Sequence, residues 1–170
     1  MKLKYNNITV RESSVNDAVY LHKYWNESGW TISLDEVKAS IIKESNSIVY
    51  QYMIDAGEKT VGDIHYGNVD NKGAEIGVYI RDDNEKSKGY GTTAMIMLID
   101  VLLNRLGYDR IVFNTNVDNK CMRHIAENKF GLTPVIHENI LQEQSGTYES
   151  YAEYELKKEM WQNKIDYEIL

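Results

Sequence analysis

The sequence predicts a single mixed domain of the α/β or α+β class, with a mostly antiparallel central sheet. Segments that alternate apolar and polar residues, as half-buried strands do, are interspersed with segments of helical periodicity. They follow one another in the order β-αα-βββ-α-β-α-β-β, which is typical of mixed folds. The length of 170 residues, with 42% hydrophobic and 26% charged residues, suits one globular domain and leaves little room for a second.

The first half of the chain is expected to hold one strand, a pair of helices and a three-stranded meander. Each helix follows a capping-box pattern, Ser14 with Asp17 and Ser33 with Glu36, in which two side chains satisfy free N–H groups at the helix start. The turns DAGEK and DNKG are short enough to join antiparallel neighbours. The strands are expected at residues 8–12, 47–54, 60–69 and 74–80.

The second half is expected to alternate helices with strands. Gly107 and Gly131 are placed to end the two helices, and Asn119 is placed as the N-cap of the second. The tail at 158–170 has no pattern that assigns it, although it is a candidate for packing against a partner subunit in a homodimer. The elements are helix 91–107, strand 110–117, helix 119–131, an extended piece at 132–136 followed by a polar loop, and strand 147–156.

Composition limits the classes of function. The net charge of −7 argues against a nucleic-acid partner, which selects for a basic face. The N-terminus has no signal-peptide pattern, and no window approaches the ~18 apolar residues of a membrane span. Cys121 is the only cysteine, which excludes an intrachain disulfide and a multi-cysteine zinc site, and it is expected to be a small buried residue. We therefore expect a cytoplasmic protein with no metal and no membrane partner.

A glycine-rich turn, EKSKGYGTTAM at residues 85–95, precedes the longest helical segment. Such turns bind phosphate because the first N–H groups of a helix have no intrahelical acceptor. A Walker A loop does not fit, since Lys88 precedes Gly89 and the first glycine of that motif is missing. The dinucleotide-binding fingerprint Gly-x-Gly-x-x-Gly/Ala matches the residue types at 89–94. However, a polar stretch separates it from the preceding strand, and only about sixty residues follow the helix, too few for the remaining parallel strands.

The third candidate is the pyrophosphate turn of the GCN5-related N-acetyltransferases (GNAT), which this sequence resembles. Their motif Arg/Gln-x-x-Gly-x-Gly/Ala reads Lys-Ser-Lys-Gly-Tyr-Gly at residues 86–91, with lysine in the first position. Residues 74–80, 110–119 and 122–135 are similar to the family's fourth strand, its fifth strand and the helix and strand that follow. The resemblance covers residues 5–160 and is closest to the ribosomal-protein alanine N-acetyltransferases. It implies the GNAT fold, with helices on both faces of the sheet.

The resemblance also implies acetyl-CoA as co-substrate. In the turn, glycines let the backbone approach the pyrophosphate and lysines supply charge. The pantetheine arm would bind the main chain of Val78 and Ile80 like an added strand, and Asn119 would contact it. The alternatives are that the lysines are solvated loop residues and that Asn119 is a plain N-cap. The pyrophosphate residues are expected to be Lys86, Ser87, Lys88, Gly89, Tyr90, Gly91 and Thr92.

Acyl transfer to an amine needs a base and a donor for the developing oxyanion. Glu75, at the start of the fourth-strand segment, is the candidate base, because the family often places a glutamate there that acts through a water. His65 is a second candidate base, and the backbone N–H of Val78 is the expected oxyanion donor. The family's tyrosine general acid, seven residues after the Asn, is replaced here by Ala126.

The acceptor is expected to be a small-molecule or peptide amine. Aromatic side chains together with a carboxylate suit an ammonium-bearing substrate, and Trp25, Trp30, Asp63 and His65 are the candidates. The sequence therefore predicts an N-acetyltransferase that acts by direct transfer on a protein N-terminus, a polyamine or an aminoglycoside-like amine. The alternative is a non-catalytic acyl-CoA-binding module of the same fold.

Overall fold

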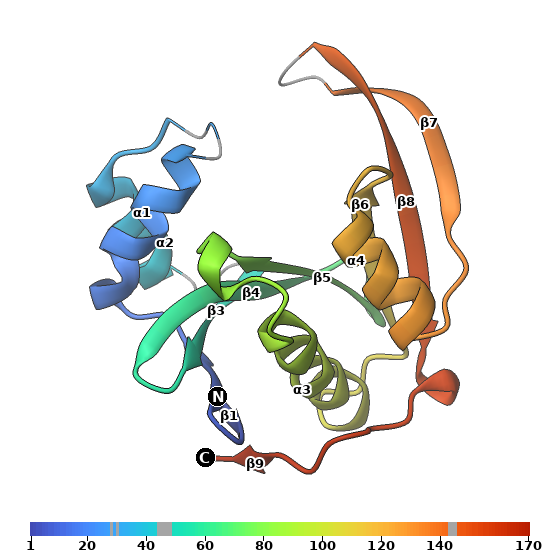
Figure 1. The fold of residues 1–170 in the computed structure, drawn as a ribbon, viewed down its shortest axis with the longest axis horizontal. Helices are drawn as coiled ribbons and strands as arrows, with labels where there is room; N and C mark the ends of the chain where they lie inside the picture. The colour runs from blue at the N-terminus through green and yellow to red at the C-terminus, as the bar shows by residue number, and fades with distance from the viewer. Residues whose placement is uncertain (28, 30, 44–48, 143–145) are drawn as a thin grey trace. The chain divides into compact units, whose positions relative to one another are not determined.

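The chain folds into two compact units in a computed structural model, shown in Figure 1. The structure describes residues 1–27, 29, 31–43, 49–142 and 146–170. Strand β5 (Gly73–Ile80) and helix α3 (Tyr90–Asn104) contribute residues to both units. The first unit comprises Met1–Gly67, Val78–Leu98 and Lys164–Leu170, and the second comprises Asn68–Gly77 and Ile99–Asn163.

The first unit is built on antiparallel strands that are neighbours along the chain. Leu3, Val10 and Ile54 lie opposite one another across three strands and are fully buried. Because a one-residue slip of any of these strands would turn its buried residue toward the other face, the three residues hold the register. The strands are β1 (Lys2–Tyr5), β2 (Ile8–Glu12), β3 (Val49–Ala56) and β4 (Lys59–Asn68).

The two ends of the chain form strands that the sequence did not predict. β1 is one of them, and β9 (Glu168–Ile169) pairs with it, with Leu3 opposite Ile169. The tail left without assignment therefore contains a 3-10 turn, Lys158–Met160, and then returns to the sheet of the first unit. A strand of two residues is too short to carry an alternating pattern, so β9 could not be recognised from the sequence.

Helices α1 (Ala18–Glu27) and α2 (Leu34–Lys43) lie side by side in the first unit (Figure 1). A short 3-10 turn, Val15–Asp17, leads into α1, and both predicted capping boxes form. The buried cluster that joins the helices to β3 consists of Ala18, Leu21, Val37, Ile41 and Met53.

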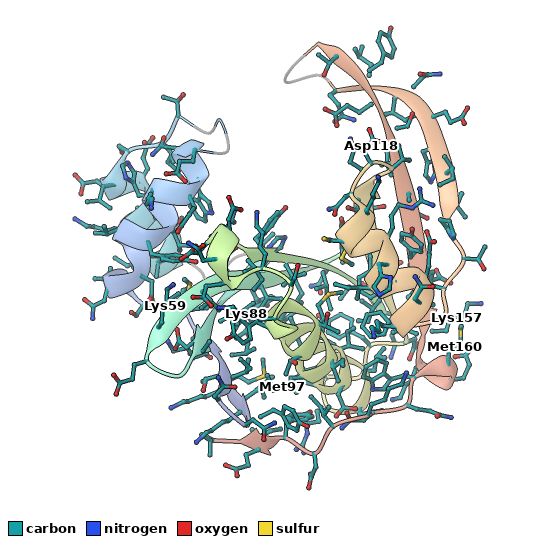
Figure 2. The ribbon with its side chains drawn as sticks, viewed as in Figure 1. Lys59, Lys88, Met97, Asp118, Lys157 and Met160 are labelled. Carbon is teal, nitrogen blue, oxygen red and sulfur yellow. The ribbon has the colours of Figure 1, made fainter. Side chains whose placement is uncertain are left out.

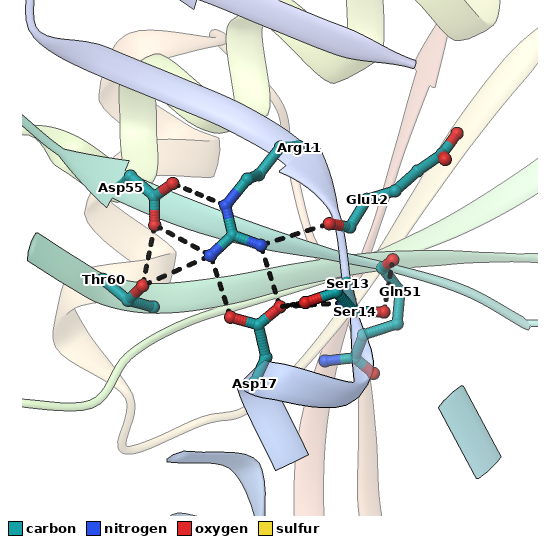
Figure 3. A network of polar contacts seen from close by, with 8 residues as sticks. All are labelled: Arg11, Glu12, Ser13, Ser14, Asp17, Gln51, Asp55 and Thr60. Atoms are coloured by element: carbon teal, nitrogen blue, oxygen red, sulfur yellow. Dashed lines mark hydrogen bonds and ion pairs between the residues drawn. The ribbon is translucent and has the colours of Figure 1, made fainter. Parts of the chain in front are cut away.

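Arg11 fixes the start of α1 against the sheet (Figure 3). Its guanidinium donates to both carboxylate oxygens of Asp17 at 2.8 Å, and its Nε donates to Asp55 at 2.6 Å. Burial alone would raise the pKa of Asp17, but hydrogen bonds from Arg11 and Ser14 outweigh it and hold that pKa below its ordinary value. One arginine on β2 thus connects the helix start to β3.

Replacing Arg11 by methionine is expected to lower the free energy of unfolding by about 2–3 kcal/mol, because two mostly buried carboxylates, Asp17 and Asp55, lose their partner. A carboxyl whose pKa is lowered in the folded state contributes stability that is present above the unfolded pKa of about 3.9 and lost as the pH falls. Wild-type stability should therefore begin to decline below roughly pH 5 and continue to fall as the pH passes below the unfolded pKa, less steeply in R11M. Urea denaturation at several pH values measures both effects. Arg105→Met, at an exposed position, is the control, and equal losses in the two variants would contradict this account.

The second unit holds the remaining strands. β5 runs parallel to β6 (Arg110–Asn116) over Gly73–Glu75, and β6 continues antiparallel to β8 (Thr147–Lys157). β8 in turn pairs with β7 (Val135–Gln142). The strand order is β7-β8-β6-β5-β4-β3-β2-β1-β9, a mixed and mostly antiparallel sheet, which confirms the predicted fold class.

Helix α3 is stopped as the sequence predicts but ends earlier, at Asn104. Gly107 has a φ of +81°, and the N–H of Tyr108 bonds to the carbonyl of Leu102, a glycine-terminated helix end. Helix α4 (Lys120–His124) continues into a π turn, Ile125–Lys129, which no sequence pattern indicated.

Two smaller expectations are wrong. Cys121 is exposed, because it lies in the first turn of α4, where no residue of the helix is buried. The segment after Ile136, expected to be a polar loop, belongs to β7 as far as Gln142. Most β7 side chains are exposed, so polar residues there do not disrupt the strand.

Candidate active site

The turn between β5 and α3 has the geometry of an anion-binding helix start. A 3-10 turn, Asp83–Glu85, comes first, and the chain then bends twice, with φ of +63° at Ser87 and +85° at Gly89. The first helical hydrogen bond runs from Thr93 N–H to the Gly89 carbonyl, at 3.0 Å. The N–H groups of residues 90–92 therefore precede the helical ladder and have no intrahelical acceptor.

The lysines of this turn are held by neighbouring carboxylates. Lys86 Nζ lies 2.6 Å from Asp83, and Lys88 Nζ lies 2.9 Å from Glu85. Lys59, on β4, donates to the same Glu85 at 2.8 Å and also to Asp82, and Figure 2 labels Lys59 and Lys88. The hydrogen bonds from Lys59 and Lys88 lower the pKa of Glu85. Each of these ammonium groups is therefore paired with a carboxylate at the turn.

The start of α3 lies against the end of β5. A Cβ added at Gly91 would lie 3.5 Å from Cγ1 of Ile80 and 3.6 Å from Cγ2 of Val78. The ladder between β5 and β6 covers only Gly73–Glu75, so it does not use the backbone of Val78 or Ile80. These two residues, expected to contact the pantetheine arm, therefore border the glycine turn.

A cavity of about 510 Å³ lies in the first unit, between the helices and one face of β3, β4 and the end of β5. Three of the acceptor residues predicted from the sequence, Trp25, Asp63 and His65, line it together. The fourth, Trp30, lies outside the described residues. The full lining is Trp25, Ile32, Ser40, Val49, Gln51, Asp63, His65, Tyr79 and Arg81.

Asp63 is paired inside this cavity. Its side chain is only 1% exposed, and it accepts from Arg81 Nε at 2.6 Å and from Arg81 Nη2 at 3.0 Å. Gln51 donates to Oδ2 at 3.0 Å. The guanidinium of Arg81 also lies over the Tyr79 ring, 4.2 Å from its centroid. Arg81 was not among the predicted site residues, because it follows the strand in a stretch that reads as a polar loop.

The loop after α1 is tied to the cavity wall by Asn26. Its amide donates to the carbonyls of His22 and Ile32, and its Oδ1 accepts from the N–H of Ile32 at 3.2 Å. Because Ile32 lines the cavity, this side chain sets one of its apolar walls.

The other predicted residues lie in the second unit. Glu75 accepts from the amide of Asn114, on β6, at 3.0 Å. Asn119 caps α4, accepting from Met122 N–H at 3.2 Å, and its amide donates to Thr115 at 2.9 Å. Ala126, where the family has its tyrosine, is fully buried. The N-cap role of Asn119 is therefore real, and its contact with a cofactor stays a prediction.

The mixed sheet and the glycine turn that opens α3 are those of a GNAT-fold domain. The family model of the acetyltransferase (GNAT) domain matches residues 8–132, and the chain belongs to this family. Among curated proteins, no match is found. No helix in the described ranges is long and apolar enough to cross a membrane. Within the same ranges, no group of three or more His, Cys, Asp or Glu could hold a metal ion.

Solved acetyltransferase structures share the fold. The Salmonella typhimurium enzyme that modifies the N-terminal serine of ribosomal protein L7/L12 is 16% identical, with a TM-score of 0.75 over 90% of this chain and 96% of that one. The microcin C7 self-immunity acetyltransferase MccE, in complex with acetyl-CoA and AMP, is 21% identical, with a TM-score of 0.75 over 90% and 93%. A spermidine N-acetyltransferase SpeG chimera from Vibrio cholerae and hSSAT is 17% identical, with a TM-score of 0.75 over 91% and 97%.

Proposed function

We propose that the protein is an N-acetyltransferase that transfers the acetyl group of acetyl-CoA directly to a primary amine in a ternary complex. One observation supports the proposal: consecutive residues at the end of β5 and just after it border two different features of the structure. Val78 and Ile80 border the glycine turn, whereas Tyr79 and Arg81 line the 510 Å³ cavity. Because side chains alternate along a strand, a cofactor at the turn and an acceptor in the cavity would meet at this strand.

The residues of the turn fit a pyrophosphate. Gly91 leaves the space of a Cβ open beside β5, and the first N–H groups of α3 are available as donors. Lys86 and Lys88 would exchange their carboxylate partners for phosphate oxygens, a charge-assisted contact. Acetyl-CoA supplies the activated thioester when bound.

The chain's own groups would handle the proton and the developing charge. Glu75 would take a proton from the attacking amine through a water, and the N–H of Val78 would stabilise the oxyanion at the carbonyl. The amine nitrogen forms the new C–N bond as the C–S bond breaks, and the sulfur leaves as thiolate. His65 is the second candidate base, because it lines the cavity itself.

The structural neighbours support this class of reaction. One was solved with acetyl-CoA, one modifies a protein N-terminal serine, and one is named for spermidine. A protein N-terminus and a polyamine are therefore acceptor classes to test, together with the aminoglycoside-like amine that the sequence analysis predicts as a third class.

Calorimetry with acetyl-CoA, followed by release of free thiol in the presence of a panel of such amines, tests the proposal. We expect binding of acetyl-CoA and amine-dependent release of thiol. Absence of binding would overturn the cofactor assignment. Binding without any amine-dependent thiol would favour the second candidate, a non-catalytic acyl-CoA-binding module, which the buried Ala126 at the family's tyrosine position supports.

A further inference from the structure

We propose that the acceptor carries a single positive charge on an apolar or aromatic body, and that Arg81 excludes polycations from the cavity. This inference rests on the proposed function and narrows its acceptor class. It follows from the pairing of Asp63, the buried carboxylate among the described lining residues, with Arg81.

Each additional ammonium group of a polycation loses its hydration in a cavity of this kind, and a carboxylate is its strongest compensating partner. Among the described residues that line the cavity, Asp63 is the only acid, and both of its oxygens accept from Arg81. Gln51 takes a further position on Oδ2. Because the Asp63 side chain is only 1% exposed and already accepts three hydrogen bonds, a second ammonium group would have to displace Gln51 or Arg81 to reach it. Displacing Arg81 would leave a largely buried guanidinium without its partner.

The neighbouring hollow offers no substitute. It encloses about 240 Å³ and contains one carboxylate, Glu27, beside Arg81 and Lys86. The described lining of this hollow therefore holds two cations and one acid, a balance that does not favour a second ammonium group. The net charge of −7 attracts any cation from a distance, but that field is screened beyond about 8 Å and does not select among amines at the site.

The walls of the cavity suit an apolar or flat body. Trp25, Ile32, Val49 and Tyr79 provide apolar and aromatic surface around the ion pair. The Tyr79 ring is covered by the Arg81 guanidinium and stacks with His65, with 6.1 Å between ring centroids. A cavity of about 510 Å³ is the size of a small-molecule or peptide-end site.

The wild-type protein tests the inference directly. We expect kcat/KM for tyramine, and for a peptide amide with uncharged side chains, to exceed kcat/KM for spermidine and kanamycin by about tenfold or more. Calorimetric binding of the same amines to the CoA-bound protein should give the same ranking. Preference for the polycations would overturn the inference and leave the proposed function standing. Absence of turnover with every amine would overturn the proposed function instead, and the binding ranking would then decide the inference.

The Arg81→Gln variant tests the proposed role of Arg81 in excluding polycations. Glutamine removes the positive charge but keeps a donor for Asp63, so we expect the ratio of kcat/KM for spermidine over tyramine to rise about tenfold. Arg110→Gln, which breaks an arginine–aspartate pair with Asp70 outside the cavity, should leave the ratio unchanged. An unchanged ratio in a folded R81Q, verified by circular dichroism, would overturn the role of Arg81. If R81Q does not fold, the wild-type ranking still decides which acceptor class the cavity takes.

Discussion

Replacing Gly91 by alanine is expected to weaken acetyl-CoA binding about tenfold or more while leaving the protein at least as stable as the wild type. The backbone of Gly91 is not left-handed, and an added Cβ would meet Ile80 and Val78 at ordinary contact distances. In a helix, alanine is favoured over glycine by up to about 1 kcal/mol. We expect weaker binding because the proposed pyrophosphate would approach the Gly91 backbone, where the added methyl group would stand in its way.

Calorimetry measures the affinity for acetyl-CoA, and urea denaturation measures the stability of the same variant. Gly89→Ala provides the comparison for both quantities. Gly89 has open space around it but a φ of +85°, so alanine there should cost about 1–2 kcal/mol of stability through backbone strain. If G91A bound acetyl-CoA as tightly as the wild type, the cofactor would not approach the backbone at this position.

The sequence predicted the elements whose signals are local. The starts of the first two helices could be predicted from Ser14 and Ser33, because a capping box is contained within four residues. The end of α3 could be predicted from Gly107, because this helix end requires a left-handed φ at that one residue. The segments that alternate apolar and polar residues predicted the central strands to within a few residues, because this alternation is also a local signal.

What the sequence could not give depends on partners distant along the chain. β9 exists because Leu3 pairs with Ile169 at the opposite end, and Lys59 reaches Glu85 only after β4 and β5 have paired. Asp63 lines the cavity together with Trp25, but its partner Arg81 lies 18 residues on along the chain and is predicted locally to be a solvated loop residue. The cavity's charge balance is therefore a property of the fold.

Replacing Glu75 by glutamine is expected to lower kcat by about 10²–10³ and to leave the affinity for acetyl-CoA unchanged. Glutamine is close to isosteric and its Oε1 can still accept from Asn114, so β5 and β6 should keep their geometry. What it lacks is the basicity to take the proton from the attacking amine. Stopped-time assays of thiol release, with calorimetry for acetyl-CoA, measure the two quantities on one preparation.

Two further variants show whether a loss of kcat in E75Q is due to the loss of Glu75 as the base. Glu138→Gln, at an exposed position on β7, controls for the loss of one negative charge and should retain full turnover. His65→Phe tests the competing base: if its kcat falls by a similar factor while E75Q remains active, the proton goes to His65 at the cavity wall. Absence of turnover in wild type and variants alike, with acetyl-CoA still bound, would make the protein an acyl-CoA-binding module. A selective loss in E75Q would instead locate proton transfer at the start of β5, the strand whose far end borders the turn and the cavity.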